Sequence, residues 1–230
     1  MYETIRIVGK LKPKYVIWEN VKNLLSEKHK HNFDKYLQAL EDLGYTNFYQ
    51  VLNAKDYGLP QHRERIFTVS ILNGDEFKFP TGQNLNIRLR DFLESEVDTK
   101  YYLNETKTNE FLSNLKPPIV TDKNDEIIVM RIGGIFDTEK SRHQAGSVYN
   151  INGLSPTLDT MQGGWRHPCI YKNGRVRRLT PKECWLLMGF DIEDFNKAST
   201  INSDSQLYKQ AGNSIAVNVL TKILEVLLNE

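Results

Sequence analysis

The sequence predicts an α/β protein with a layered sheet at the start of the chain, followed by an irregular, mostly β subdomain. Two observations carry this prediction. Apolar stretches at helical and strand spacing alternate along residues 1–72. Between residues 73 and 174 this alternation gives way to short apolar runs among Gly, Asn, Asp and Thr. Because such a shift in composition marks a domain boundary, we expect one near residue 74.

Two helices and three strands are expected in the first part of the chain. Residues 1–11 and 32–43 carry apolar side chains at helical spacing, and Gly44 ends the second helix. The strands are expected at 15–19, 47–52 and 65–72. The first strand is a continuous apolar run that stops at Glu19. We therefore expect it to be buried on both faces, with Glu19 facing a substrate at its carboxyl end.

The rest of the chain carries turn and capping signals. Short β runs are expected at 127–130 and 169–172, and Asn173-Gly174 predicts a hairpin after the second run. Thr180-Pro181-Lys182-Glu183 is a capping box with proline at the first helical position, which predicts a short helix. A final helix is expected over 214–230.

Length and composition set few limits on function. The 230 residues include 30 basic and 29 acidic side chains, so the net charge of +1 argues neither for nor against a nucleic-acid partner. Two cysteines provide neither a disulfide framework nor a metal-ligand set. No apolar run approaches the roughly 18 residues of a membrane span. We expect a cytoplasmic protein without a bound metal or a membrane partner.

The first group of polar residues that could carry chemistry opens the third strand. In Gln61-His62-Arg63-Glu64-Arg65 the side chains of Gln61, Arg63 and Arg65 share one face of an extended chain. An anion or a base edge could separate the two guanidiniums, since the planar fork of arginine matches both. A solvated edge strand with ordinary ion pairs is the alternative.

Two further groups lie late in the sequence. Basic residues crowd around the Asn173-Gly174 turn, interleaved with Trp165 and Tyr171: Arg166, His167, Lys172, Arg175, Arg177, Arg178 and Lys182. Such a patch is typical of phosphate binding, and a solvated hairpin explains it equally well. Gln210-Ala211-Gly212-Asn213-Ser214 combines a close backbone approach with amide donors for a ligand, or simply caps a helix.

The order and spacing of these motifs resemble the DNA cytosine-5 methyltransferase family. The resemblance covers nearly the whole chain and rests on Glu19-Asn20-Val21, Gln-x-Arg-x-Arg at 61–65, Arg-Leu-Thr-Pro-Lys-Glu at 178–183 and Gly212-Asn213-Ser214, with 52–60 and Thr157-Leu158 as further matches. The family's early motifs, a glycine-rich S-adenosylmethionine loop and a Pro-Cys dipeptide that carries the nucleophile, are absent. Pro168-Cys169 lies too late, so both cysteines are interpreted as structural. The chain resembles the C-terminal part of such an enzyme.

The resemblance implies a fold and a set of sites. The fold would be the C-terminal part of a Rossmann-like S-adenosylmethionine-dependent methyltransferase sheet (1–73), a target-recognition subdomain (74–177), and late helices that return to the catalytic domain (178–230). Glu19, Arg63 and Arg65 would be catalytic. Glu19 would hold a flipped cytosine, and Arg65, with Arg63 behind it, would contact the flipped nucleotide and its phosphate or orient the site. Asn213 and Ser214 would help to wall the cofactor pocket. The residues implied to contact DNA are Gln61, Thr157, Leu158, Arg166, Arg175 and Arg177.

The implied reaction transfers a methyl group from S-adenosylmethionine to C5 of a cytosine in duplex DNA, within a restriction-modification system. The expected partners are duplex DNA and an N-terminal methyltransferase half carried by a separate chain. A gene fragment and a DNA-binding module without catalysis are the alternatives, and methylation of RNA cytosine is a third.

Overall fold

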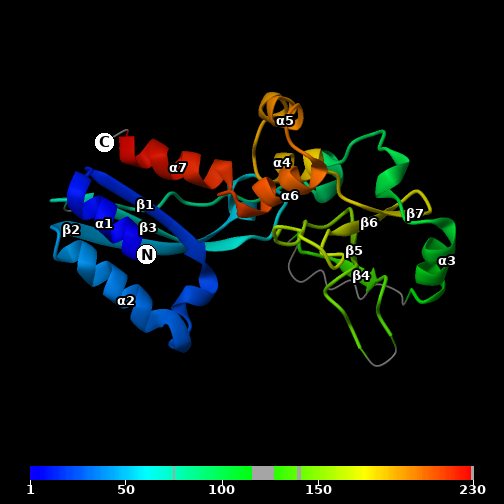
Figure 1. Ribbon diagram of the computed structural model, residues 1–230, viewed down its shortest axis with the longest axis horizontal. Helices are drawn as coiled ribbons and strands as arrows, with labels where there is room; N and C mark the ends of the chain where they lie inside the picture. Colours follow the sequence, from blue (N-terminus) through cyan, green and yellow to red (C-terminus); the bar gives the residue numbers. More distant parts are fainter. Residues whose placement is uncertain (75, 116–126, 139–140, 229–230) are drawn as a thin grey trace. The chain divides into compact units, whose positions relative to one another are not determined.

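The computed structural model describes residues 1–74, 76–115, 127–138 and 141–228 (Figure 1). The chain divides into two compact units. The first unit comprises Met1–Asn53, Glu64–Gly82 and Val219–Glu230, and the second comprises Ala54–Arg63 and Gln83–Asn218. The domain limits expected from the sequence, after residues 73 and 177, stay predictions.

The first unit contains a three-stranded antiparallel sheet in the order β1-β3-β2. Its strands are β1 (Tyr15–Val21), β2 (Tyr45–Asn53) and β3 (Glu64–Leu72). The central strand β3 is buried continuously from residue 66 to residue 71, because it has a neighbour on each side and is covered on both faces. The prediction that β1 is buried on both faces is wrong, since β1 is an edge strand of this sheet in which only Val16 is buried.

Helices cover both faces of this sheet. Figure 1 shows α2 (Glu27–Glu41) on one side and the final helix α7 (Val217–Leu228) on the other. Short α1 (Tyr2–Leu11) and the 3-10 turn η1 (Lys22–Leu25) complete the unit. The apolar stripe of α2 places Phe33, Tyr36 and Leu40 in a core with Val16 and Ile66. The helix begins before the expected start at residue 32, since its N-cap is residue 26.

The second unit contains a four-stranded sheet in the order β4-β5-β6-β7. Its strands are β4 (Arg131–Gly134), β5 (Ser147–Asn150), β6 (Cys169–Lys172) and β7 (Arg175–Arg178), and β5 and β6 run parallel. The predicted hairpin between β6 and β7 is confirmed, with Asn173 at φ 52° and Gly174 at φ 77°, as a tight turn of this kind requires. The β run expected at 127–130 is not a strand, because pairing with β5 starts at Arg131.

The second unit also contains helices and short turns. They are η2 (Ala54–Tyr57), η3 (Leu89–Phe92), η4 (Thr99–Tyr101), α3 (Glu105–Ser113), α4 (Pro181–Leu187), α5 (Ile192–Ser199) and α6 (Asp204–Asn213). The capping box that predicted α4 is present, with Thr180 and Glu183 bonded reciprocally to each other's backbone. The sequence did not predict α3, α5 or α6, although each begins after an Asn, Asp or Ser that caps it through its side chain.

The helix expected over 214–230 is shorter than predicted. Helix α6 ends at Asn213 and α7 begins at Val217, with a break between them. Residues 229 and 230 lie outside the described residues. Within the described part of the chain, Asp204–Leu228 is apolar and long enough to qualify as a candidate membrane span. Because this stretch is two separate helices with buried core faces, its hydropathy has a simpler explanation in packing.

Candidate functional site

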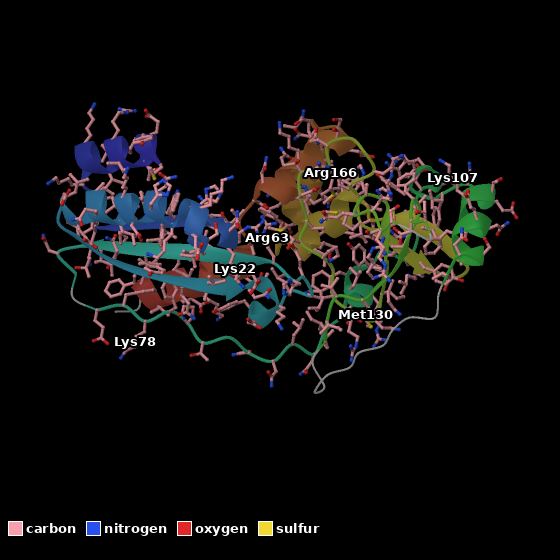
Figure 2. All side chains as sticks on the ribbon, turned by 90° about the horizontal axis from the view of Figure 1, so that it is seen from below. Lys22, Arg63, Lys78, Lys107, Met130 and Arg166 are labelled. Carbon is pink, nitrogen blue, oxygen red and sulfur yellow. The ribbon has the colours of Figure 1, made fainter. Side chains whose placement is uncertain are left out.

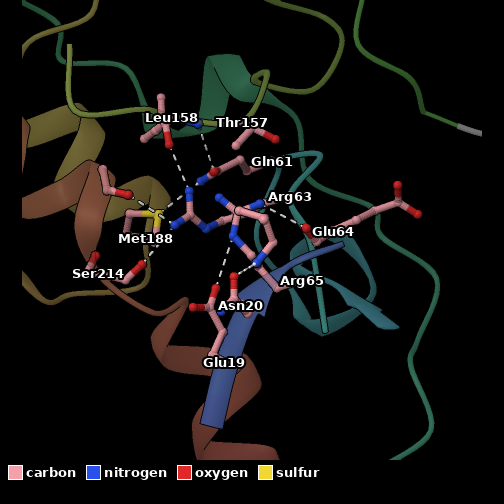
Figure 3. A network of polar contacts seen from close by, with 12 residues as sticks. Glu19, Asn20, Gln61, Arg63, Glu64, Arg65, Thr157, Leu158, Met188 and Ser214 are labelled. Carbon is pink, nitrogen blue, oxygen red and sulfur yellow. Dashed lines mark hydrogen bonds and ion pairs between the residues drawn. The ribbon is translucent and has the colours of Figure 1, made fainter. Parts of the chain in front are cut away.

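The carboxylate of Glu19 pairs with the guanidinium of Arg65 inside the first unit (Figure 3). Val21 of β1 lies opposite Arg65 of β3, so Glu19 and Arg65 are diagonal neighbours on one sheet face. Arg65 Nε lies 3.0 Å from Glu19 Oε1, and the side chains are only 16% and 18% exposed. Burial lowers the pKa of Arg65 and the charge of Glu19 opposes that shift. The pair is a charged, largely desolvated group near the end of a strand.

Asn20 does not act together with Glu19 on the same face, because successive strand residues point to opposite sides. Its side-chain Oδ1 accepts a hydrogen bond from the backbone N–H of Val21 at 2.8 Å. This bond shapes the chain just before η1.

The guanidinium of Arg63 is buried in the second unit and binds three backbone carbonyls (Figure 3). It donates to Leu158 O at 2.8 Å, to Gly212 O at 3.1 Å and to Ser214 O at 2.9 Å. Arg63 is only 3% exposed, which excludes the solvated edge strand at this position. Its side chain is enclosed and fixes the two segments that it joins, so it has no free surface for a nucleotide, and its expected role in orienting the site stays a prediction.

Gln61 lies in the same interior and reinforces this arrangement. Its amide nitrogen donates to Leu187 O at 2.9 Å, and its oxygen accepts from Leu158 N at 3.2 Å. Gln61 and Leu158 are both fully buried, so the expectation that they contact DNA is wrong in this structure. Thr157, by contrast, lies at the surface, where its hydroxyl donates a hydrogen bond to His62 O at 2.7 Å.

Gly212 brings the end of α6 into direct contact with the 159–160 backbone. A Cβ at this position would overlap the carbonyl group of Asp159. The close approach expected for this glycine is thus made to the protein's own backbone. Asn213 and Ser214 follow at the C-terminal end of α6, where the sequence predicted a helix start. The Ser214 hydroxyl donates to Ala211 O, whereas the exposed amide of Asn213 bonds to no described side chain or backbone group.

The basic residues around the β6–β7 hairpin fall into two classes. Arg175 is exposed and lies 3.8 Å from the centre of the Tyr102 ring. Arg177 is 1% exposed, and both of its terminal nitrogens donate hydrogen bonds to the carboxylate of Glu183, at 2.8 and 2.7 Å. The expected DNA contact of Arg177 is wrong, because a guanidinium committed to a buried carboxylate cannot reach a phosphate. Arg166 is 65% exposed and remains available.

Neither cysteine has the properties of a nucleophile. Both are buried, and burial raises the pKa of Cys169 to about 12 and that of Cys184 well above its usual value. Since the thiolate is the reactive form, both thiols are unreactive at neutral pH. A search of the described residues finds no group of three or more His, Cys, Asp or Glu side chains that could hold a metal ion.

Two groups of importance were not identified from the sequence. Glu183 was assigned only as a cap, yet it also holds Arg177 and accepts from Glu94 N at 2.9 Å. Asp159 was not singled out, although it faces Arg166 across a cavity of the second unit. The capping box signalled Glu183, but no local pattern signals Asp159.

Comparison with solved structures identifies the fold first as that of a methyltransferase. The chain aligns with the S. pombe Dnmt2 methyltransferase at a TM-score of 0.67 and 17% identity, over 99% of this chain and 71% of that one. It aligns with the Entamoeba histolytica methyltransferase EhMeth at a TM-score of 0.65 and 16% identity, over 94% and 63% of the two chains. At this identity the likeness concerns the fold alone.

Sequence comparison then gives the family. Residues 1–229 match the family described as C-5 cytosine-specific DNA methylase, and the chain belongs to that family. It is 40% identical to the type II methyltransferase M2.ScrFI of Lactococcus lactis subsp. cremoris, over 99% of this chain and 58% of that protein. It is 33% identical to the type II methyltransferase M.HhaI of Haemophilus parahaemolyticus, over 96% and 65%. The chain thus spans little more than half the length of M2.ScrFI.

Proposed function

We propose that this chain forms the C-terminal part of a DNA cytosine-5 methyltransferase of a restriction-modification system. The enzyme transfers a methyl group from S-adenosylmethionine to C5 of a flipped cytosine in duplex DNA. The observation that supports this proposal best is the Glu19–Arg65 pair at 3.0 Å, at the end of a strand in a chain of this family. A partly desolvated ion pair is costly to build, and such pairs concentrate at functional sites.

The chemistry of the two side chains suits a cytosine ring. The ring presents N3 and an exocyclic amine on one edge, and a carboxyl group can hydrogen-bond to both. In the proposed site Glu19 holds this edge, and Arg65 orients Glu19 and stabilises negative charge on the nucleotide. Arg63 acts from a distance, because it fixes the segment that carries Thr157.

S-adenosylmethionine is the methyl donor of C-5 cytosine DNA methyltransferases, and it supplies the methyl group when bound. The residues present fit one wall of a site for it. Asn213 offers an exposed amide that is not committed to any described group, and Ser214 is held through its carbonyl by Arg63. A glycine-rich loop for the cofactor does not occur in this sequence. The rest of the cofactor site therefore belongs to another segment.

We assign that segment, together with the cysteine nucleophile, to an N-terminal half on a separate chain. Two features of the first unit support this assignment. Strand β1 is an edge strand, so one side of its backbone can pair with a further strand. Ile7, Leu11 and Val21 are 46%, 68% and 50% exposed, which leaves apolar surface on α1 and at the end of β1.

The test is reconstitution of methyl transfer. The chain is mixed with the part of M2.ScrFI that it does not match, and transfer of a labelled methyl group to duplex DNA is compared with transfer to tRNA. We expect activity on duplex DNA that neither part shows alone. Glu19→Gln is expected to lower the rate by roughly a hundredfold or more while the two parts still associate.

Each other result has a defined meaning. Duplex binding without any methyl transfer in the mixture would indicate a DNA-binding module and contradict the proposed enzyme. Activity that favours tRNA would replace the proposed substrate. A Glu19→Gln variant with full activity would remove Glu19 from the chemistry.

A further inference from the structure

The second unit contains a cavity to which none of the roles above has been assigned. Its volume is about 220 Å³, and its walls include Gln144, Ser147, Asp159, Arg166 and His167. Pockets that hold drug-sized molecules have volumes of roughly 300–1,000 Å³. This cavity is therefore suited to the edge of one small planar group and not to a whole cofactor.

The two main walls are fixed to each other by the sheet. Strands β5 and β6 are parallel, and Val148 is paired with Cys169, so the segments that precede these strands emerge side by side. A backbone hydrogen bond from Gly146 N to Trp165 O, 2.8 Å long, joins the same two segments. The side chains that precede each strand therefore face a cavity of defined width.

The loop that carries Arg166 has an unusual backbone. Met161, Gly163, Gly164 and Trp165 all have positive φ, from 51° to 68°. For methionine and tryptophan this conformation is strained, so surrounding contacts must hold it. The Trp165 ring packs edge-on against Phe136, with 5.9 Å between the ring centres. The position of Arg166, next in the chain, follows from this held loop.

Arg166 has a charged neighbour but remains free to bind something else. It lies at the surface of the second unit, where Figure 2 labels it, and its side chain is 65% exposed. Arg166 Nη1 is 3.8 Å from Asp159 Oδ2, which is too long for a hydrogen bond. No other described residue accepts a hydrogen bond from this guanidinium. Asp159 itself is anchored, since its Oδ1 accepts from Met161 N at 2.6 Å.

We propose that this cavity reads a guanine of the DNA duplex, with Arg166 as the residue that contacts the base and Asp159 as the residue that orients Arg166. The inference rests on the proposed function, because it takes duplex DNA as the ligand. Guanine presents two acceptors, O6 and N7, on its major-groove edge, and the planar fork of arginine matches them.

The charges and hydrogen-bond donors of Arg166 and Asp159 argue against a phosphate or another base as the ligand of this cavity. The carboxylate of Asp159, 3.8 Å from the guanidinium of Arg166, would repel a phosphate bound to that guanidinium. At this edge adenine and thymine each present a single acceptor and cytosine presents an amine, so only guanine accepts from both nitrogens of the fork. His167 adds no positive charge at neutral pH, since burial and Arg178 lower its pKa. A neutral acceptor edge is the ligand that fits.

The test uses the complete chain and measures duplex binding, so that methyl transfer is not needed. A preferred duplex is selected from a random pool, and each guanine in turn is replaced by 7-deazaguanine, which lacks the N7 acceptor. Fluorescence anisotropy then gives the affinity for each duplex. We expect the unsubstituted chain to lose about tenfold at one guanine, in line with a bidentate contact.

Variants assign that loss to the cavity. Arg166→Lys keeps the charge but removes the fork, and should be insensitive to 7-deazaguanine at that one position only. Asp159→Asn should weaken the sensitivity at the same position, because the carboxylate no longer orients Arg166. Arg90→Lys makes the same chemical change at another exposed site of the second unit and should keep the unsubstituted pattern.

The outcomes separate this inference from the proposed function. If Arg166→Lys weakens binding to all duplexes by one factor, Arg166 contacts phosphate and the inference is wrong while DNA binding stands. The inference is equally wrong if the variant retains the tenfold loss at that guanine. Failure of the unsubstituted chain to bind any duplex, both alone and mixed with the part of M2.ScrFI that it does not match, would overturn the inference and the proposed function together.

Discussion

The guanidinium of Arg177 binds the carboxylate of Glu183 through two hydrogen bonds, with both terminal nitrogens within 2.8 Å of its oxygens and both side chains buried. The pair joins β7 to α4. Glu183 also accepts hydrogen bonds from the backbone N–H groups of Glu94 and Thr180, so the carboxylate is fully occupied. The attraction of Glu183 raises the pKa of Arg177 despite its burial.

Removing one member of this pair should destabilise the second unit strongly. Arg177→Leu leaves a buried carboxylate without its counter-charge, and we expect a loss of about 3–5 kcal/mol in the free energy of unfolding. Urea unfolding followed by circular dichroism measures this loss.

The double variant Arg177→Leu, Glu183→Leu should lose less free energy of unfolding than the sum of the two single variants. Arg175→Leu, at an exposed neighbouring position, should cost about 1 kcal/mol or less. Equal losses for Arg175 and Arg177 would contradict the assignment.

Gly212 should tolerate no larger residue. In Gly212→Ala the added methyl group would overlap the Asp159 carbonyl, so the end of α6 must move away from the 159–160 segment. We expect a loss of about 1–3 kcal/mol in the free energy of unfolding, as for other overpacked sites. Gly9→Ala is the matched control, because its methyl group would meet only Leu43 at 3.7 Å and lies within α1. That control should be neutral or slightly stabilising, since alanine favours helices.

Loss of the Arg63 guanidinium should loosen two segments at once. Arg63→Met keeps much of the side-chain volume but removes all three hydrogen bonds to Leu158, Gly212 and Ser214. Hydrogen exchange should become faster at residues 157–159 and 212–214, while β1 and β3 keep their protection. Each hydrogen bond to a charged group contributes roughly 1.5–3 kcal/mol, so the change should exceed tenfold in exchange rate. Faster exchange across the whole chain would indicate global unfolding instead.

His167 should make the stability of the second unit depend on pH. Burial, together with the charge of Arg178, lowers the pKa of this imidazole below its ordinary 6.5, while Asp159 opposes the shift. Below pH 6.5 the imidazole is therefore protonated more readily in the unfolded chain than in the folded chain. The contribution of neutral His167 to the free energy of unfolding is fully present above pH 6.5 and is lost as the pH falls. Unfolding measured from pH 8 to pH 5 should show this decline, and His167→Gln should reduce it. An unchanged slope in the variant would exclude His167 as its source.

The elements that the sequence predicted well are those with local signals. Periodicity placed α1 and the three strands of the first sheet, Asn173-Gly174 placed the β6–β7 hairpin, and Thr180 with Glu183 placed α4. Each of these depends on residues close together in the chain. Helices α5 and α6 also had a local signal, an N-cap residue, but a mostly polar sequence obscured it.

The burial of Gln61 and Arg63 could not be predicted in this way. The partners of Arg63 lie 95 to 151 residues further along the chain, and nothing around residue 63 indicates which carbonyls will meet it. An alternating Gln-x-Arg-x-Arg pattern describes a shared strand face equally well at a surface and in an interior. The pairing of Glu19 with Arg65 differs, because the register of two neighbouring strands brings them together.

A Cβ atom added at Gly163 or at Gly164 would have no neighbouring atom within 4 Å, although Arg166 follows only two residues after Gly164. Chain length can therefore change at this tip without disturbing the interior that Arg177 and Glu183 hold together. The tip is a natural place for insertions, and varying its length would be an economical way to diversify which DNA sequences the protein prefers. A library built there would alter the reading surface and leave the buried Arg177–Glu183 pair of the second unit untouched.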